Sequence, residues 1–306
     1  MLSFVIPCYR SEKTIETVVN EIISMLSTKQ IDKYEIILVN DYSPDNVWSV
    51  IKNLSENNKQ IKGISLARNF GQHAALMAGY AHCTGDYVVS LDDDGQAPLE
   101  SLFRLIDKLE EGYDVVYAYY NEIRQNSFRV FGSKMAQKMG EMMLSVPKDF
   151  KGSSFYVARK FVIDEIIRYK NTYPYVFGLV FRTTRNVTSI PTEHRSRLVG
   201  KSGYSFTKLF ALWMNGFTAF SVKPLRISTF LGVFTAFLGF IYGIITIIKK
   251  LVNPEVAVGY SSIICAILFI GGIIMMMLGL IGEYIGRMYI CMNNSPQYVI
   301  KEIKNL

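Results

Sequence analysis

Cysteine is scarce in this sequence, and the scarcity excludes two classes of covalently stabilised protein. The 306 residues include only four cysteines, at positions 8, 83, 265 and 291. They show neither the paired spacing of a zinc site nor the density of a disulfide-rich scaffold. A reducing compartment fits this usage best.

An apolar signal-peptide core is missing from the first residues. The opening apolar run is short and meets Pro7 and then charged residues, whereas a signal peptide needs an apolar core of about 7–15 residues. We therefore expect the amino terminus to remain in the cytoplasm.

Charged residues make up only 19% of the chain, whereas 50% of the residues are hydrophobic and the mean hydropathy is +0.19. This composition is too apolar for an ordinary soluble protein and favours a membrane-associated globular one. The formal net charge of +7 favours an anionic partner, which could be nucleic acid, anionic lipid or a phosphorylated substrate. The length is consistent with about two structural units.

Short β-branched runs alternate with helical patterns over residues 1 to about 125. This order predicts an α/β fold with a mostly parallel sheet that is covered on both faces. Ligands of such sheets bind beyond the carboxyl ends of the strands. The expected strands are Leu2–Ile6, Tyr34–Val39, Ile61–Leu66, Tyr87–Leu91 and Asp114–Tyr119, and the expected helices are Glu12–Leu26, Pro44–Asn57, Gly71–Cys83 and Pro98–Glu111.

Two long apolar runs follow in the last third of the chain. Ile227–Ile248 contains no charge and, at 1.5 Å per residue, reaches about 33 Å, which is enough to cross a bilayer core. A second run extends from Ser261 to about Gly282. We expect transmembrane helices at about 227–248 and 261–282, which return the chain to its starting side. The preceding segment Phe206–Ser221 suits either an interfacial helix or a core helix.

This pattern divides the chain into four parts. We expect a cytoplasmic globular domain over residues 1–203, an interfacial segment over 204–226, the two membrane helices within 227–285 and a cytoplasmic tail over 286–306. The large domain ahead of the first span would have to be exported if the hairpin were reversed, so both termini are placed in the cytoplasm.

An acidic turn, Asp92-Asp93-Asp94-Gly95-Gln96, ends the fourth expected strand. Adjacent carboxylates repel one another unless a cation compensates, and Mg²⁺ or Mn²⁺ prefers oxygen ligands. Because residues i and i+2 share a face in extended chain, Asp92 and Asp94 are expected to form the ligand pair, Asp93 to point elsewhere and Gln96 to add an oxygen. The alternative is a solvated acidic turn.

Two further strand ends suggest a nucleotide crevice. Pro7 and Tyr9 follow the first strand, where the Tyr9 ring can stack on a base, and Asp41 follows the second, where a carboxylate can accept from a base or a ribose hydroxyl. The sequence has neither a P-loop motif nor the glycine motif of dinucleotide-binding folds. From the strand-end residues we expect a bound nucleoside diphosphate, although both of these motifs are missing.

Several motifs, taken in order, resemble family 2 glycosyltransferases. They also resemble, within that family, the polyprenyl-phosphate glycosyltransferases, the group containing dolichol-phosphate mannose synthases and bactoprenol glucosyltransferases. Later segments, including Arg197–Tyr204 and Gly282–Arg287, extend the likeness to nearly the whole chain. The motifs are Val5-Ile6-Pro7-Cys8-Tyr9, Val39-Asn40-Asp41-Tyr42-Ser43, Leu66-Ala67-Arg68-Asn69-Phe70-Gly71 and Asp92-Asp93-Asp94-Gly95-Gln96.

The resemblance implies a GT-A-like, membrane-bound hexosyltransferase that moves a sugar from a nucleotide-sugar to undecaprenyl or dolichyl phosphate. It implies catalytic Asp92 and Asp94, and an Mg²⁺ or Mn²⁺ ion on Asp92, Asp94 and Gln96. The implied donor-binding residues are Pro7, Tyr9, Glu12, Asp41, Arg68 and Asp93, and the implied acceptor-phosphate residues are Arg129, Ser133, Arg197, Lys201 and Ser202. The implied partners are the donor, the lipid phosphate and a bilayer, and nucleic acid is not among them.

The sequence departs from the family pattern at several of these positions. Arg10 replaces the usual Asn, Asn40 a frequent Asp and Tyr42 the usual Gly, and Tyr120 lies near a frequent Arg. The family's Gly-Asp-Phe-Arg, whose Asp is a candidate base, corresponds to Ser153-Ser154-Phe155-Tyr156. The general base is therefore unassigned, with Asp149, Glu193 and His194 as weak candidates.

Two other functions stay open beside lipid glycosylation. A processive polysaccharide synthase would share the nucleotide crevice, but such enzymes usually carry Gln-x-x-Arg-Trp, and neither Trp48 nor Trp213 follows an arginine. A non-enzymatic membrane scaffold would leave the acidic turn unexplained. Self-association through the spans is left open.

Overall fold

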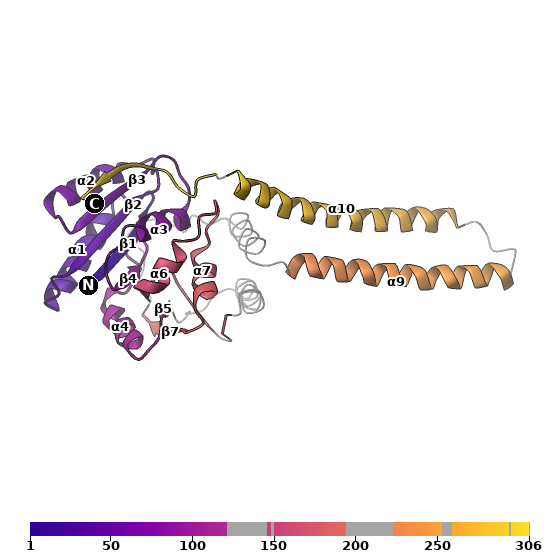
Figure 1. Cartoon of the computed structure of the whole chain (residues 1–306), viewed down its shortest axis with the longest axis horizontal. Coiled ribbons are helices and arrows are strands. Elements are labelled where there is room, and N and C mark those ends of the chain that lie inside the picture. The colour runs from indigo at the N-terminus through magenta and orange to yellow at the C-terminus, as the bar shows by residue number, and fades with distance from the viewer. Residues whose placement is uncertain (121–145, 148–149, 194–222, 253–258, 294, 306) are drawn as a thin grey trace. The chain divides into compact units, whose positions relative to one another are not determined.

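The chain folds into two units in the computed structural model, which describes residues 1–120, 146–147, 150–193, 223–252, 259–293 and 295–305 (Figure 1). One unit comprises Met1–Trp213 together with Asn294–Leu306, and the other comprises Met214–Asn293. The first is an α/β unit and the second is a pair of long helices. The expected boundary between residues 203 and 204 lies outside the described residues.

Four parallel strands form the centre of the α/β unit. They are β1 (Leu2–Cys8), β2 (Tyr34–Asn40), β3 (Ile61–Leu66) and β4 (Tyr87–Ser90). All seven residues of β1 are buried, as expected for a parallel strand covered on both faces. This double burial explains why the strand sequences are nearly continuous apolar runs.

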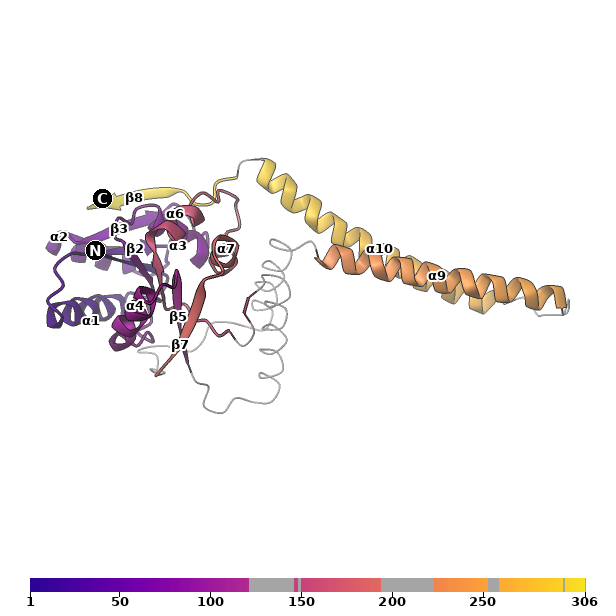
Figure 2. The ribbon, with the colours of Figure 1, turned by 60° about the horizontal axis from the view of Figure 1, so that its bottom comes forward.

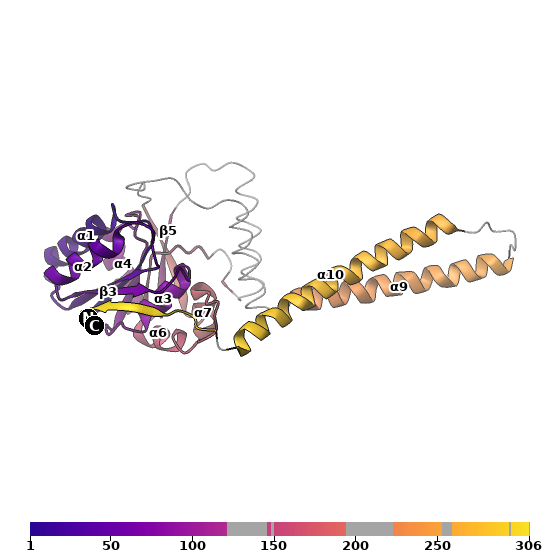
Figure 3. The ribbon, with the colours of Figure 1, turned by 90° about the horizontal axis from the view of Figure 1, so that it is seen from above.

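Helices cover both faces of this sheet (Figure 3). Phe4 and Ile6 of β1 share a buried cluster with apolar residues of the helices on one face, whereas Val5 points to the opposite face against α3. This alternation follows from the two-residue period of a strand. The first face carries α1 (Ile15–Thr28), α2 (Val47–Asn57) and α4 (Leu102–Glu110), and the second carries α3 (Gln72–Tyr80), α6 (Lys160–Ile166) and α7 (Val176–Thr183).

The complete sheet has eight strands in the order β7-β5-β6-β4-β1-β2-β3-β8. β6 (Tyr156–Arg159) runs antiparallel to both β4 and β5 (Val115–Tyr120), whereas β7 (Val187–Thr192) is parallel to β5. The sheet is therefore mixed, but β5 and β7 run in the same direction as β1–β4, and only β6 and β8 among the described strands run against them, so the expectation of a mostly parallel sheet holds. The reversed direction of β6 brings the residues before Tyr156 to the carboxyl end of β4.

The carboxyl-terminal strand β8 (Ile300–Lys304) pairs antiparallel with β3 at the edge of the sheet (Figure 2). Trp48 Nε1 donates a hydrogen bond to Glu302 Oε2 over 3.0 Å, and the Ala67 amide donates to the Val299 carbonyl over 2.8 Å. Gln297 is buried and donates to the carbonyls of Tyr169 and Asn171. The segment 286–306, expected to be a tail, is therefore largely ordered, because α10 extends to Met292 and β8 completes the sheet.

The second unit consists of α9 (Lys223–Val252) and α10 (Tyr260–Met292), both longer than the predicted spans. Among the described residues, Phe269–Met292 is the one stretch long and apolar enough to cross a membrane, and Gly232–Ile245 is a shorter apolar stretch. Large side chains such as Phe230 (74% exposed) and Met275 (70% exposed) lie on the surface of these helices. Helices with apolar residues on their exposed surfaces suit a lipid environment.

Candidate active site

The acidic turn begins directly after β4 and lies beside the end of β1. Asp93 Oδ2 accepts a hydrogen bond from the Tyr9 amide over 2.9 Å, so the turn is tied to the residue that follows β1. β1 and β4 are parallel neighbours, and their carboxyl ends therefore meet at one edge. The sheet places the acidic turn where α/β folds bind ligands.

Asp92 is held from two sides. The Gln72 side-chain amide donates to Oδ1 over 2.7 Å, and the Ser154 hydroxyl donates to Oδ2 over 2.5 Å. Gln72 begins α3, whereas Ser154 lies just before β6. Two elements that are distant in the sequence therefore orient one carboxylate.

Asp94 and Gln96 complete the predicted ligand set within the same turn. The Gln96 backbone N–H donates to Asp94 Oδ1 over 3.1 Å, and Asp92, Asp94 and Gln96 are all half-buried. Among the described residues, no three His, Cys, Asp or Glu side chains gather as a metal centre. Two carboxylates and an amide fit a cation such as Mg²⁺, which fills the rest of its shell with phosphate oxygens and water.

The turn concentrates negative charge. Burial, together with the neighbouring carboxylates of Asp92 and Asp94, raises the pKa of Asp93 to about 6, against the hydrogen bonds with Ser11 and Tyr9, which lower it. Burial also raises the pKa of Tyr120, whose hydroxyl hydrogen-bonds Ser153 and lies within the field of Asp92 and Asp94. A bound cation would relieve this repulsion.

Asp41 forms a second polar site after β2. It is only 3% exposed, and its carboxylate accepts from the backbone amides of Phe70 and Gly71 over 2.7 and 2.8 Å. The Asn69 side chain donates to the Asp41 carbonyl. Burial raises the pKa of Asp41, and the two amide hydrogen bonds lower it. Asp41 therefore fixes the turn between β3 and α3.

A hydrogen-bonded network joins the loops after β1 and β2. Ser43 Oγ accepts from the Arg10 amide over 2.7 Å and donates to Asp45 Oδ1. Asp45 Oδ2 accepts from the Glu12 amide, and Glu12 Oε2 accepts from the Asn46 amide over 3.2 Å. These hydrogen bonds therefore fix the loop after β1, which carries the predicted nucleotide-sugar ligand Glu12, against the loop after β2.

Two of the sequence departures have left-handed backbone. Arg10 has φ 59° and Tyr42 has φ 51°, a region that Asn and Gly enter more easily than other residues. The family's usual Asn and Gly at these positions are explained by this geometry. Strained backbone of this kind tends to persist at ligand sites. Tyr9, next to Arg10, and Tyr42 itself are 45% and 55% exposed, so their side chains can receive a ligand.

The predicted site residues differ in where the structure places them. Tyr9, Glu12, Asp41 and Asp92–Gln96 lie at the carboxyl edge of the sheet, whereas Pro7 is buried inside β1. Arg68 is exposed, with its guanidinium 4.6 Å from the centre of the Phe70 ring. The predicted acceptor residues Arg129, Ser133, Arg197, Lys201 and Ser202 lie outside the described residues, as do Asp149 and His194.

The family's aspartate and arginine positions have different roles in this chain. Ser154 contacts Asp92, whereas Tyr156 is buried, with its hydroxyl against that of Tyr80 and its ring 4.7 Å from that of Tyr117. Tyr156 therefore belongs to the core behind the turn. Glu193, a weak candidate base, is exposed just after β7.

Sequence reasoning missed Gln72, Ser43 and Asp45. Gln72 directly follows the recognised motif that ends at Gly71, and this adjacency is the one feature of the sequence that could have indicated a role at the site. Ser43 ends the recognised motif that begins at Val39, and Asp45 follows Pro44, at which a helix was expected to start, but no sequence pattern indicated a link between loops. Their partners become known only from the fold.

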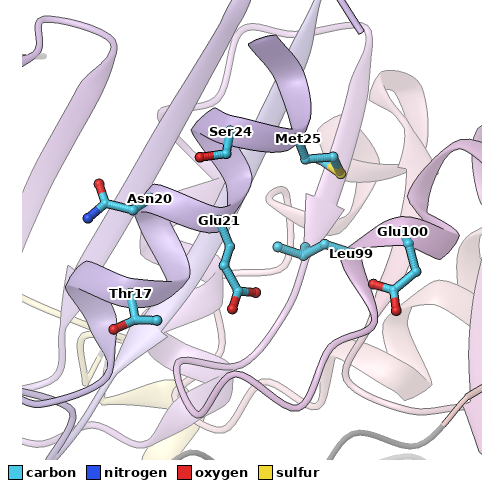
Figure 4. Close-up of a pocket in the computed structure, with 7 residues that line it drawn as sticks. All are labelled: Thr17, Asn20, Glu21, Ser24, Met25, Leu99 and Glu100. Carbon is cyan, nitrogen blue, oxygen red and sulfur yellow. The ribbon is translucent and has the colours of Figure 1, made fainter. Parts of the chain in front are cut away.

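The surface also has a groove of about 580 Å³ between α1 and η1 (Leu99–Ser101) (Figure 4). Its lining includes the carboxylates Glu21 and Glu100 and no lysine or arginine, so it does not suit an anionic nucleotide. None of the predicted donor or metal residues lines it. It is lined by Thr17, Asn20, Glu21, Ser24, Met25, Leu99 and Glu100.

Comparison with protein families gives two matches along the chain. The profile described as "Glycosyl transferase family 2" matches residues 3–167, which include β1–β4 and the acidic turn. The profile described as "GtrB C-terminal hairpin" matches residues 223–288, which include most of α9 and α10. The two matches correspond to the two structural units.

Similar proteins cover nearly the full chain. The "SfII prophage-derived bactoprenol glucosyl transferase" of Shigella flexneri is 32% identical over 308 residues, covering 98% of this chain and 97% of its own length. The "Undecaprenyl-phosphate 4-deoxy-4-formamido-L-arabinose transferase" of Klebsiella pneumoniae (strain 342) is 31% identical over 305 residues, covering 99% and 93%. The "Uncharacterized glycosyltransferase YkcC" of Bacillus subtilis (strain 168) is 31% identical over 301 residues, covering 98% and 93%.

Among solved structures, glucosyl-3-phosphoglycerate synthase from Mycobacterium tuberculosis in complex with Mn²⁺ and UDP-glucose is similar to the α/β unit. The TM-score is 0.52 at 21% sequence identity, with coverage of 71% of this chain and 77% of that chain. At this identity the similarity establishes the fold, which is GT-A-like.

Proposed function

Because the chain belongs to glycosyl transferase family 2, we propose that this glycosyltransferase moves a sugar from a nucleotide-sugar to a polyprenyl phosphate at a membrane surface. The observation that carries this proposal is the acidic turn Asp92–Gln96 at the edge where Tyr9 and Asp41 also lie. The names of two full-length relatives, which specify bactoprenol and undecaprenyl phosphate, support the acceptor class.

The donor nucleotide occupies the crevice formed by the ends of β1 and β2. The exposed Tyr9 offers a stacking surface for the base. The Asp41 carboxylate is buried and already accepts from the Phe70 and Gly71 amides, so it acts as an acceptor for the base or a ribose hydroxyl through its remaining lone pairs. Glu12 and Arg68 lie on loops that border this crevice. Asp93 holds the Tyr9 backbone, so its contribution to donor binding is through position.

Asp92, Asp94 and Gln96 hold Mg²⁺ or Mn²⁺ in this proposal. Their fit rests on two carboxylates and an amide within one turn, and on the burial and neighbouring negative charges that raise the pKa of Asp93 between them. When bound, the cation neutralises negative charge that develops on the departing diphosphate. Asp92 and Asp94 thereby fix where the diphosphate lies.

The acceptor phosphate attacks the anomeric carbon of the sugar. A new carbon–oxygen bond forms as the bond to the nucleoside diphosphate breaks, and its electron pair leaves with the diphosphate. A phosphate monoester has a second pKa near 6 and is already anionic at neutral pH, so it needs little help from a base. Ser154 in place of a carboxylate is consistent with such an acceptor. Arg129, Ser133, Arg197, Lys201 and Ser202 are the proposed phosphate ligands.

The shared sheet supports a hairpin with two membrane crossings. β1–β4 precede α9 and β8 follows α10, yet all five strands belong to one sheet. The chain must therefore cross a membrane an even number of times between them. If Phe269–Met292 spans, a second crossing is required, which we assign to α9 with its apolar stretch Gly232–Ile245, and we assign the side that carries the α/β unit to the cytoplasm. A membrane-anchored site stays close to an acceptor that cannot leave the bilayer.

The test is a transfer assay with the purified full chain in vesicles. A panel of labelled nucleotide-sugars is incubated with undecaprenyl phosphate, with and without EDTA, and label is measured in extracted lipid. Metal-dependent labelling of a single lipid product supports the proposal. A growing polymer would support a processive synthase, and failure to label lipid with any donor would contradict the acceptor assignment.

A further inference from the structure

Gln72 contacts the acidic turn from outside it. Its side-chain amide lies 2.7 Å from Asp92 Oδ1, while Ser154 occupies the other oxygen of the same carboxylate. A carboxylate offers about four lone-pair positions, so neither of these two hydrogen bonds by itself excludes a cation from Asp92. Because Gln72 is uncharged, it fixes the carboxylate without competing for the cation electrostatically.

The backbone that delivers Gln72 is fixed by Asp41. Phe70 and Gly71, the two residues before Gln72, donate their amides to the Asp41 carboxylate. Gly71 has φ 90° and ψ 158°, a conformation that is essentially restricted to glycine, and this turn starts α3 at Gln72. One turn therefore contacts both Asp41 and Asp92.

We propose that Gln72 is a positioning residue that orients Asp92 for cation binding and couples the cation site to Asp41. The proposal rests on the proposed function, since it assigns Asp92 to the cation and Asp41 to the nucleoside. Partners that orient metal ligands in this way usually change metal affinity about 10–100-fold when they are removed. Gln72 is exposed and contributes little to the core, so its loss leaves the fold intact.

The test compares two glutamine substitutions in the purified full chain. Gln72→Leu removes the donor to Asp92, while Gln60→Leu removes an equivalent side-chain hydrogen bond to the Asp32 carbonyl, before the start of β3. Mn²⁺ affinity is measured by electron paramagnetic resonance without nucleotide. We expect about tenfold weaker binding for Gln72→Leu, no change for Gln60→Leu and similar thermal unfolding temperatures for both.

A double-mutant cycle tests the coupling to Asp41. Asp41→Asn removes one of the two acceptor oxygens that hold the turn. We expect this variant to weaken Mn²⁺ binding, and the loss to be smaller when Gln72 is already Leu, because both changes act through the same hydrogen bond to Asp92. Fully additive losses would show that Asp41 does not act through Gln72.

The outcomes separate this inference from the proposed function. Wild-type chain that binds Mn²⁺ while Gln72→Leu binds equally well would overturn the positioning role and leave the cation assignment intact. Wild-type chain that binds no Mn²⁺, with or without UDP or GDP, would overturn both. Weaker Mn²⁺ binding by Gln72→Leu together with an unchanged unfolding temperature supports the inference.

Discussion

The Ser154 hydroxyl donates a 2.5 Å hydrogen bond to the Asp92 carboxylate across the junction of β4 and β6. A hydrogen bond to a charged group contributes about 1.5–3 kcal/mol, and about 1.4 kcal/mol corresponds to tenfold in rate or affinity. The free energy contributed by this hydrogen bond is thus large enough to affect turnover, although Ser154 is not one of the reacting groups.

We expect Ser154→Ala to reduce the initial rate of lipid glycosylation about tenfold, because Asp92 loses one orienting donor. Asp92→Ala, which removes the ligand itself, should reduce the rate far more. Initial rates at saturating donor and acceptor measure both effects. Equal losses in the two variants would mean that the Ser154 hydroxyl takes a direct part in transfer.

Asp94→Ala should abolish turnover while the protein stays folded and membrane-bound, because one of two carboxylate ligands is lost. EDTA should inactivate the wild-type protein to a similar extent, and added Mn²⁺ should restore the wild-type protein but not the variant. Asp107→Ala on the exposed side of α4 serves as a matched control. Full activity in Asp94→Ala would remove the metal assignment.

Gly71→Ala should destabilise the fold and also weaken donor binding. A methyl group there meets no atom within 4 Å, so the cost arises from the positive φ alone and is about 1–3 kcal/mol. Gly112, with φ 110° and equally open surroundings, lies before β5 at the opposite end of the sheet. Gly112→Ala should lower the unfolding temperature similarly, and nucleotide affinity measured by calorimetry should fall only for Gly71→Ala.

The buried side chain of His73 should make the free energy of unfolding depend on pH. Burial lowers its pKa from 6.5 to about 4, its Nδ1 has no hydrogen-bond partner among the described residues, and its ring packs edge-on against Tyr175. Between about pH 6.5 and 4 the unfolded chain binds this proton more readily than the folded chain, so the free energy of unfolding falls as pH falls through that window. Denaturant unfolding of His73→Phe, which keeps a ring, should show a weaker decline. Parallel curves for the two proteins would contradict the assignment.

Removal of Ile300–Leu306 should make the α/β unit prone to association. The deletion bares the β3 edge and removes the partners of the Trp48 indole and of the Ile61 carbonyl. Exposed edge strands pair readily with other chains. We expect faster proteolysis and larger species in size-exclusion chromatography, whereas a monodisperse, equally stable variant would show that β8 is dispensable.

The sequence predicts the centre of the fold well and its edges poorly. Continuous apolar runs and helical periodicity locate β1–β4 and their helices, because burial on both faces leaves a strong pattern. β8 has only five residues, of which three are charged and two are isoleucines three positions apart, and its partner β3 lies more than 230 residues earlier in the chain, so no local pattern identifies the pairing.

The candidate site shows a similar division. Asp92–Gln96 can be located from sequence because a run of carboxylates after an apolar strand is unusual. The contact between Gln72 and Asp92 depends on the positive-φ turn at Gly71 and on the order of the strands in the sheet. Neither can be deduced from the spacing of residues in the sequence. The roles of Ser154 and Tyr156 likewise depend on the reversed direction of β6.

The position of β8 also affects how this protein is made. Because β8 follows α10 in the chain, the sheet that contains β1–β4 acquires this strand only after both α9 and α10 have been synthesised. The β3 edge therefore lacks its partner while the two long helices are being made. The hairpin helices are thus available for insertion before β8 can close the edge of the sheet.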